Sequence, residues 1–140
     1  MLLWTEQFEC GSPRLDMQHQ MLINNINHLE GMLTSTNPTR EECSFLVHLV
    51  GFLESYAEVH FAAEEDCMRG CRCPASRQNQ RAHEQYREFF RHFKARCQAE
   101  GFRPEVLKDL HATISDWIEN HILRVDTQLK PCLKSLPPSN

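Results

Sequence analysis

The feature that most constrains the fold is a helical spacing of apolar residues through nearly the whole chain. Four stretches carry apolar residues three and four positions apart, which is the spacing of one buried helix face. They span roughly 16–33, 39–68, 75–99 and 104–130. Alternating strand patterns are nearly absent, and the connections are short. The sequence therefore predicts an all-α fold, an antiparallel up-down-up-down four-helix bundle with an extended N-terminal lead.

Length and charge limit the class of protein. The chain has 140 residues, enough for one domain with a buried core. Its formal net charge is −4 and its basic residues are scattered, so no nucleic-acid partner and no membrane-surface role are indicated. Its longest apolar run is too short for membrane insertion, and the N-terminus lacks a signal-peptide pattern. We therefore expect a cytoplasmic protein.

The C-terminus and the cysteines suggest further features. We expect residues 1–130 to form the bundle, and residues 131–140, with their Pro-Pro pair, to form a tail or linker. The chain has seven cysteines, which we expect to be thiols in a reducing compartment. Cys67, Cys71 and Cys73 lie together but lack the Cys-x-x-Cys redox spacing. We interpret them as loop thiols in preference to a redox switch.

Residues that can bind a metal fall inside the apolar faces of all four predicted helices. They are His19 on the first, His60 and Glu64 on the second, His83 on the third, and His121 and Asp126 on the fourth. His60 and Glu64 are four positions apart and therefore share a helix face. A buried charge without a partner is costly, and a metal ion supplies that partner. Four imidazoles and two carboxylates from four helices predict a binuclear iron site in preference to a zinc site.

Other metal motifs are missing from the chain. A ferritin-like site needs Glu-x-x-His and a zinc hydrolase needs His-Glu-x-x-His, and neither occurs. The five-residue offset between His121 and Asp126 does not share one face of an ideal helix. Asp126 would have to lean across the seam, or the helix would have to bulge locally.

In combination, these motifs resemble the bacterial hemerythrin family over nearly the whole length of the chain. The matching segments are the Trp4 lead, Leu15-Asp16-x-Gln18-His19, His60-Phe61-x-x-Glu64-Glu65-x-x-Met68, the loop ending at Pro74, His83-Glu84, and Trp117-Ile118-x-x-His121-Ile122-x-x-x-Asp126. His-x-x-x-x-Asp is the family's own spacing, so the resemblance accounts for the five-residue offset.

The resemblance implies a set of roles for these residues. His19 and His60 would bind one iron, while His83 and His121 would bind the other. Glu64 and Asp126 would bridge the two iron ions together with an oxo or hydroxo group. Exogenous solvent or dioxygen-derived ligands would complete the coordination, and the iron with two histidines would keep the open position where dioxygen binds.

The chain departs from the family at Asn79, where the third helix would carry another ligand histidine. Three interpretations are open. The Asn79 carbonyl oxygen could bind iron weakly, solvent could fill the position with Asn79 hydrogen-bonded to it, or the second iron could be lost. We favour solvent. Losing a neutral nitrogen donor should favour the ferric state and oppose reversible oxygen storage.

The resulting functional prediction is a non-haem di-iron domain that binds dioxygen and acts as an oxygen or redox sensor, with a signalling output domain as a possible partner. A reversible dioxygen carrier or store is the alternative, and a peroxide- or nitric-oxide-reducing enzyme is a third. We assign no catalytic residues. We expect Leu22, Ile23, Tyr56 and Trp117 to form the wall of the oxygen pocket, because each lies about one helical turn from a ligand histidine. Glu65 and Glu84 are expected to point into solvent.

Overall fold

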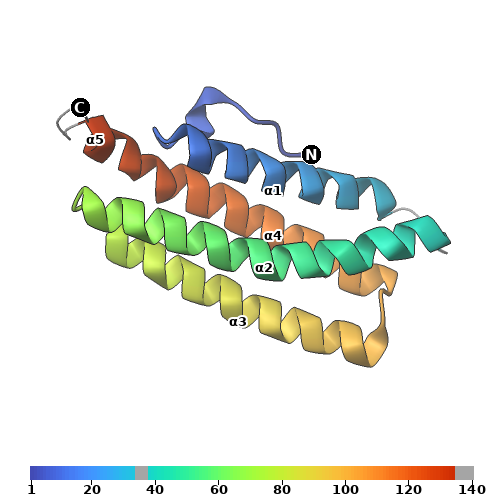
Figure 1. Ribbon diagram of the computed structural model, residues 1–140. Helices are drawn as coiled ribbons and strands as arrows, with labels where there is room; N and C mark the ends of the chain where they lie inside the picture. The colour runs from blue at the N-terminus through green and yellow to red at the C-terminus, as the bar shows by residue number, and fades with distance from the viewer. Residues whose placement is uncertain (34–37, 135–140) are drawn as a thin grey trace.

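Four long helices run side by side along the molecule, joined by short connections at its two ends (Figure 1). This computed structural model describes residues 1–33 and 38–134. The long helices are α1 (Pro13–Met32), α2 (Arg40–Gly70), α3 (Ser76–Glu100) and α4 (Pro104–Arg124). The remaining elements are the 3-10 turns η1 (Glu6–Phe8) and η2 (Asp126–Gln128) and the short helix α5 (Leu129–Lys134). The described residues contain no strand, and the predicted all-α four-helix bundle is confirmed.

Local sequence signals set the ends of the helices. The Ser12 side chain accepts a hydrogen bond from the backbone N–H of Leu15 at 3.3 Å and caps α1. Thr39 caps α2 in the same way, through the N–H of Glu42 at 3.1 Å. Each such cap contributes about 1 kcal/mol because it satisfies an otherwise unpaired amide. Gly101 ends α3 with a φ of 77°, a conformation that favours glycine.

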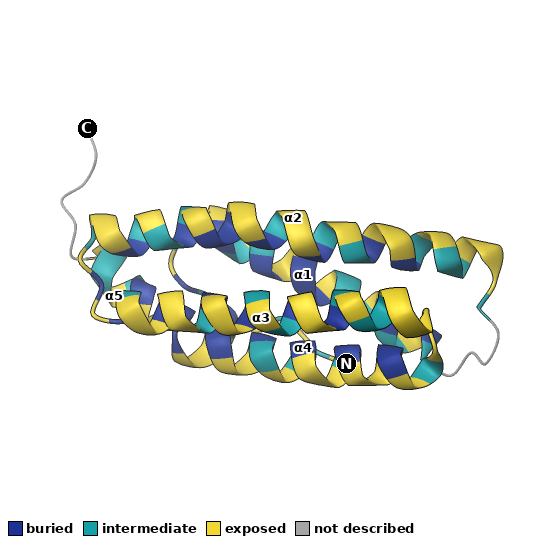
Figure 2. Ribbon diagram, turned by 90° about the horizontal axis from the view of Figure 1, so that it is seen from below, coloured by how far each residue is buried: buried dark blue, intermediate teal, exposed yellow. Residues whose placement is uncertain are grey.

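The helices enclose one long core. α1 and α3 each contact both α2 and α4, so the four form a closed ring around it. Figure 2 shows the buried positions on the inward faces and the exposed positions on the outer faces. Ile26, Leu53, Ile114 and Ile118, one or two from each of three helices, are completely buried. The apolar spacing in the sequence therefore marks the packed faces correctly.

The helical course breaks just before Asp126. α4 ends at Arg124, Val125 has φ −111° and ψ −59°, and η2 begins at Asp126. α5 then follows directly, so it crosses residue 130, where the sequence suggests the end of the bundle. That boundary remains a prediction. The expected turn at 34–37 and the tail residues 135–140 lie outside the described residues.

No helix in the described part of the chain combines the length and the apolar composition needed to cross a membrane.

Candidate metal centre

Seven polar side chains from all four long helices and η2 meet inside the bundle. Each is at most 3 % exposed, in a core that is otherwise apolar. They are His19, His60, Glu64, Asn79, His83, His121 and Asp126. The structure thus brings together every residue for which the sequence suggests a role as ligand, together with Asn79.

The first half of the cluster is formed by α1 and α2. The Nε2 atoms of His19 and His60 lie 2.9 Å apart. Both face the same carboxylate oxygen, Glu64 Oε2, at 3.2 Å and 3.3 Å respectively. One helical turn separates His60 from Glu64, so the two side chains converge on this point from a single face of α2.

The second half is formed by α3 and α4 and uses the other oxygen of the same carboxylate. Glu64 Oε1 lies 3.0 Å from His83 Nε2 and 3.2 Å from His121 Nε2. The Glu64 carboxylate therefore stands between two histidine pairs, with one oxygen directed at each.

The two carboxylate oxygens of Asp126 likewise face different halves of the cluster. Its Oδ2 lies 3.2 Å from His19 Nε2, and its Oδ1 lies 2.9 Å from His121 Nε2. The five-residue offset from His121 is possible because α4 has already ended and the 3-10 turn η2 begins at Asp126. Neither a lean across the seam within a continuous helix nor a bulge is needed; a change of helix type positions the carboxylate.

The charges of the cluster are unbalanced unless cations enter it. Within the described residues, the ion-pair partners of Glu64 and Asp126 are all histidines. Burial alone would raise the pKa of Glu64, but hydrogen bonds with His121, His19 and the other two histidines hold it well below its usual range. Two buried carboxylates among neutral imidazoles require positive charge, which protons or metal ions can supply.

The same two opposing effects, burial and the nearby carboxylates, set the pKa values of three of the histidines. Burial lowers the pKa of His19, but hydrogen bonds to Asp126 and Glu64 outweigh it and raise that pKa to about 10. His121 behaves alike, with burial opposed mainly by the Asp126 charge, and its pKa rises to about 9. His60 differs, because burial prevails and lowers its pKa. Without metal, protons therefore gather beside Asp126.

Two side chains outside the cluster, Gln18 and Glu65, lie beside its imidazoles. His60 Nδ1–H donates to Gln18 Oε1 at 2.6 Å, which directs the Nε2 lone pair into the cluster. Glu65 Oε2 lies 3.4 Å from His83 Nδ1, with its side chain only 22 % exposed. The expectation that Glu65 points into solvent is therefore wrong, whereas Glu84 is exposed and pairs with Arg87. Glu65 is thus an ion-pair neighbour of His83, whose Nδ1 has no hydrogen-bond partner. A buried imidazole needs an acceptor for its second nitrogen, and that need was the available signal for Gln18.

Aromatic rings hold the imidazoles in place. Phe61 stacks on His83 with ring centroids 3.8 Å apart, and Trp117 stacks on His121 at 4.4 Å. Such stacking restricts the ring planes of His83 and His121, whose Nε2 atoms both face Glu64 Oε1.

Asn79 occupies the interior of the second half. Its Nδ2 donates to Glu64 Oε1 at 2.5 Å and to Asp126 Oδ1 at 3.1 Å, and it lies 3.4 Å from His121 Nε2. The Asn79 amide therefore contacts both carboxylates from the side of His83 and His121. Its Oδ1 is buried without a hydrogen-bond partner.

A small apolar cavity adjoins the first half of the cluster. Its lining consists of His19, Leu22, Tyr56, Ala57, His60, Phe61, Tyr86, Trp117, His121 and Ile122. Three of the four expected wall residues are among them; Ile23 is buried in the core but does not line the cavity. The Tyr56 hydroxyl is buried without a hydrogen-bond partner, whereas the Tyr86 hydroxyl donates to the Leu53 carbonyl at 3.1 Å.

The donor set fits metal ions. Among the described residues, three groups of donor atoms lie within 4.8 Å of one another, and Glu64 belongs to two of them. His19, His60, Glu64 and Asp126 form one, Glu64, His83 and His121 form another, and the third consists of Cys10, Asp16 and His19. Glu64 Oε2 and Asp126 Oδ2 are fully buried, and imidazole nitrogens 3.2–3.3 Å away are their ion-pair partners. Buried carboxylate charge of this kind calls for a compensating cation, either a protonated imidazole or a metal ion.

An antiparallel four-helix bundle with histidines and carboxylates directed into its core defines a class of helical metal-binding domains. The chain belongs to the hemerythrin family, since the family model described as "Hemerythrin HHE cation binding domain" matches residues 10–133.

Several similar relatives are named bacteriohemerythrin. The chain is 26% identical to one from Stenotrophomonas maltophilia over 122 residues, which cover 87% of this chain and 74% of that protein. It is 27% identical to one from Pseudomonas aeruginosa over 125 residues, 89% of this chain and 76% of the relative. A relative from Clostridium acetobutylicum is 21% identical over 128 residues, 91% of this chain and 98% of that protein.

Proposed function

We propose that the cluster holds two iron ions, one at each histidine pair. His19 and His60 would bind one ion, His83 and His121 the other, and Glu64 and Asp126 would bridge them. One observation supports this proposal above all. Glu64 and Asp126 each direct one carboxylate oxygen at a histidine of the first half of the cluster and the other oxygen at a histidine of the second half. Mixed imidazole and carboxylate donors suit iron, and the seven buried polar groups are too many for one tetrahedral zinc site.

We propose that solvent, and not Asn79, completes the second iron. The Asn79 amide directs N–H groups at Glu64 Oε1 and Asp126 Oδ1. Binding iron through its carbonyl oxygen would require the amide to turn over and to lose both contacts. As a donor it can instead orient solvent and the bridging carboxylates.

Dioxygen is the ligand that we propose for the site. The cavity beside His19 and His60 is small and lined almost wholly by apolar and aromatic side chains, which suits a small, uncharged molecule and limits the entry of water. Relatives named bacteriohemerythrin support the same chemistry. Reduced iron, when bound, would supply electrons to the oxygen.

Within this chemistry we propose a cytoplasmic oxygen or redox sensor. Asn79 removes one neutral nitrogen donor, and an oxygen donor in its place favours the ferric state. Asp126 lies at the start of η2, directly before α5, so a change at the metal reaches the C-terminal segment within a few residues. A neighbouring output domain could read that change.

Two measurements test the proposal. One is the iron content per chain, and the other is the optical spectrum of the anaerobically reduced protein as air is admitted. We expect two irons and a rapid, lasting change to a ferric spectrum. Glu64→Gln should lose at least one iron, whereas Glu84→Gln, an exposed control on α3, should retain both.

Other outcomes would contradict parts of the proposal. A band that appears in air and disappears on removal of oxygen would make the protein a carrier. Steady consumption of peroxide or nitric oxide with a reductant would make it an enzyme. One iron or none in the unmodified chain would refute the paired site.

A further inference from the structure

Three cysteines from distant parts of the sequence meet at one end of the bundle. Cys71 and Cys73 follow the C-terminus of α2, and Cys132 lies on α5. All three belong to a separate apolar cluster around Met68 and Leu129. We call Cys71, Cys73 and Cys132 the thiol cluster; Cys132 is the member that sequence spacing does not reveal.

Specific contacts hold the three thiols together. Cys132 packs against the same apolar cluster as Cys71 and Cys73, and its thiol interacts with both of theirs. The Cys73 thiol also donates to the Gln128 carbonyl, with Sγ and O 3.6 Å apart. The Cys71 thiol donates to the Met68 carbonyl at 3.7 Å. All are reduced in the structure. The end of α2 and the α5 segment are thus joined through sulfur.

The geometry favours a pair of sulfurs over a metal site. Four thiolates around zinc lie roughly 3.8 Å from one another, given Zn–S bonds of about 2.3 Å. Among the described residues, the groups of three or more donor atoms within 4.8 Å of one another do not include these thiols. In the described part of the chain, the three thiols therefore do not form a donor set for a single metal ion.

We propose that Cys71 and Cys132 form a redox-controlled disulfide, with hydrogen peroxide as the oxidant. Cys71 is partly exposed, whereas Cys73 is only 5 % exposed and held by the Gln128 carbonyl, so peroxide reaches Cys71 first. This proposal is independent of the iron site, because the reaction needs no metal.

The reaction has two steps. The Cys71 thiol loses its proton, and its sulfur attacks one peroxide oxygen, breaking the O–O bond to give a sulfenic acid and water. The Cys132 sulfur then attacks the Cys71 sulfur, forming the S–S bond, breaking the S–O bond and releasing a second water. Two thiols thereby lose two electrons, which one peroxide molecule takes up.

The environment of Cys71 suits a regulated and therefore slow reaction. Burial raises the pKa of the Cys71 thiol, and the hydrogen bond from Cys132 opposes that rise. The thiol is thus mostly neutral at rest, while its neighbour favours the thiolate. Once formed, the bridge would fasten α5 to the end of α2, next to the segment that begins with Asp126.

Peptide mapping of the whole protein tests the disulfide. The reduced protein is treated with equimolar hydrogen peroxide and alkylated, and its mass is measured. We expect five alkylated thiols where the reduced chain has seven. Arg72 separates Cys71 from Cys73, so trypsin distinguishes the two. The expected linked product joins peptide 70–72 to peptide 125–134, and the melting temperature should rise by roughly 10 °C.

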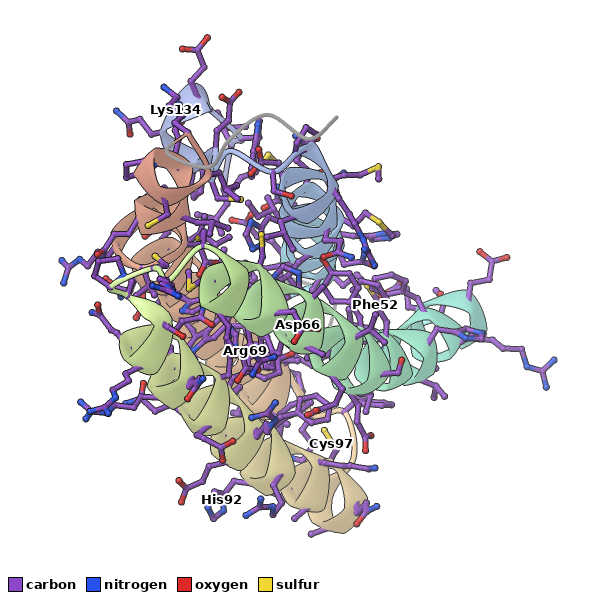
Figure 3. All side chains as sticks on the ribbon, turned by 60° about the vertical axis from the view of Figure 1, so that its left-hand side comes forward. Phe52, Asp66, Arg69, His92, Cys97 and Lys134 are labelled. Carbon is purple, nitrogen blue, oxygen red and sulfur yellow. The ribbon has the colours of Figure 1, made fainter. Side chains whose placement is uncertain are left out.

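Two variants control this experiment. Cys132→Ser should abolish the link and leave a sulfenic acid on Cys71 that dimedone traps. Cys97→Ser should still form the link, because Cys97 lies near the α3–α4 connection, at the other end of the bundle from Lys134 on α5 (Figure 3). A further control needs no substitution and can be used if a variant folds poorly. Dithiothreitol should reverse the melting-temperature shift in the unmodified chain.

Three results would overturn the proposal. One is seven alkylated thiols after peroxide treatment. Another is a link from peptide 125–134 to peptide 73–77, which would replace Cys71 by Cys73. The third is that one zinc ion per chain, without any oxidant, protects the thiol cluster from alkylation, which would make the cluster a metal site.

Discussion

At the scale of single residues, Asn79 supplies an amide to a buried polar cluster that otherwise consists of histidines and carboxylates. It is completely buried and contacts both carboxylates of the cluster. An imidazole at the same position would offer a lone pair to a metal, whereas the amide offers hydrogens to Glu64 and Asp126. In the proposed two-iron site, this position therefore decides how many nitrogen donors the second iron would have.

Asn79→His should add a third imidazole beside His83 and His121. We expect tighter retention of the second iron and at least tenfold slower oxidation in air, because a neutral nitrogen donor stabilises the reduced state. Iron per chain after dialysis against a chelator, and the rate of the optical change in air, measure the two effects. Asn79→Ala is the control for removing the amide alone; equal oxidation rates in all three proteins would contradict this role of Asn79.

Two tyrosines of the cavity, both with buried hydroxyl groups, allow a matched comparison. The Tyr86 hydroxyl donates to the Leu53 carbonyl, so Tyr86→Phe should lower the free energy of unfolding by about 1 kcal/mol. The Tyr56 hydroxyl has no partner, so Tyr56→Phe should change it by less than about 0.5 kcal/mol or stabilise the fold. Urea denaturation of the metal-free protein measures both. A larger loss for Tyr56→Phe would show that its hydroxyl has a partner in solution.

At the scale of elements, the short segment formed by η2 and α5 contributes to three separate parts of the molecule. It supplies Asp126 to the cluster, Leu129 to an apolar core at the end of the bundle, and Cys132 to the thiol cluster. The N-terminal lead packs against it at Gly11, where φ is 95° and an added Cβ would lie 3.1 Å from the Lys130 backbone.

Gly11→Ala should therefore destabilise the docking of α5. We expect a loss of about 1–2 kcal/mol in the free energy of unfolding, because alanine strains the positive φ and its Cβ would crowd the Lys130 backbone. Gly51→Ala, in the middle of α2 with nothing within 4 Å of the new Cβ, should instead stabilise by about 0.5–1 kcal/mol. Thermal unfolding of the two variants checks this; a stabilising Gly11→Ala would show that the contact with Lys130 is not kept in solution.

At the scale of the whole molecule, the bundle encloses a charged cluster inside an apolar core. Buried carboxylates lower the stability of a fold unless cations balance them. Metal binding should consequently contribute to the stability of the entire bundle, since all four long helices supply side chains to the cluster.

Removal of the metal should lower the melting temperature by roughly 10 °C, because ligands that bind only the folded state stabilise it. Calorimetry before and after chelation measures the shift. Asp126→Asn should reduce it strongly by weakening metal binding, whereas Asp109→Asn, an exposed control that pairs with Arg96, should leave it unchanged. An unchanged shift in Asp126→Asn would exclude Asp126 as a ligand.

Much of the bundle was predictable because its signals are local. Apolar spacing predicted the long helices, and capping side chains such as Thr39 marked where one begins. Burial of the candidate ligand residues also followed from the sequence, since each lies within an apolar face. Their roles as ligands to two irons remain a proposal.

Other features depend on contacts between residues far apart in the chain. Gln18 reaches His60, and Glu65 comes to lie 3.4 Å from His83, only because neighbouring helices bring these side chains together. Cys132 meets Cys71 only because α5 folds back onto the end of α2. The sequence by itself determined the helices and the faces that they bury, since periodicity is a property of neighbouring residues. The tertiary structure alone decided which atoms face one another across those surfaces, because packing fixes these distances.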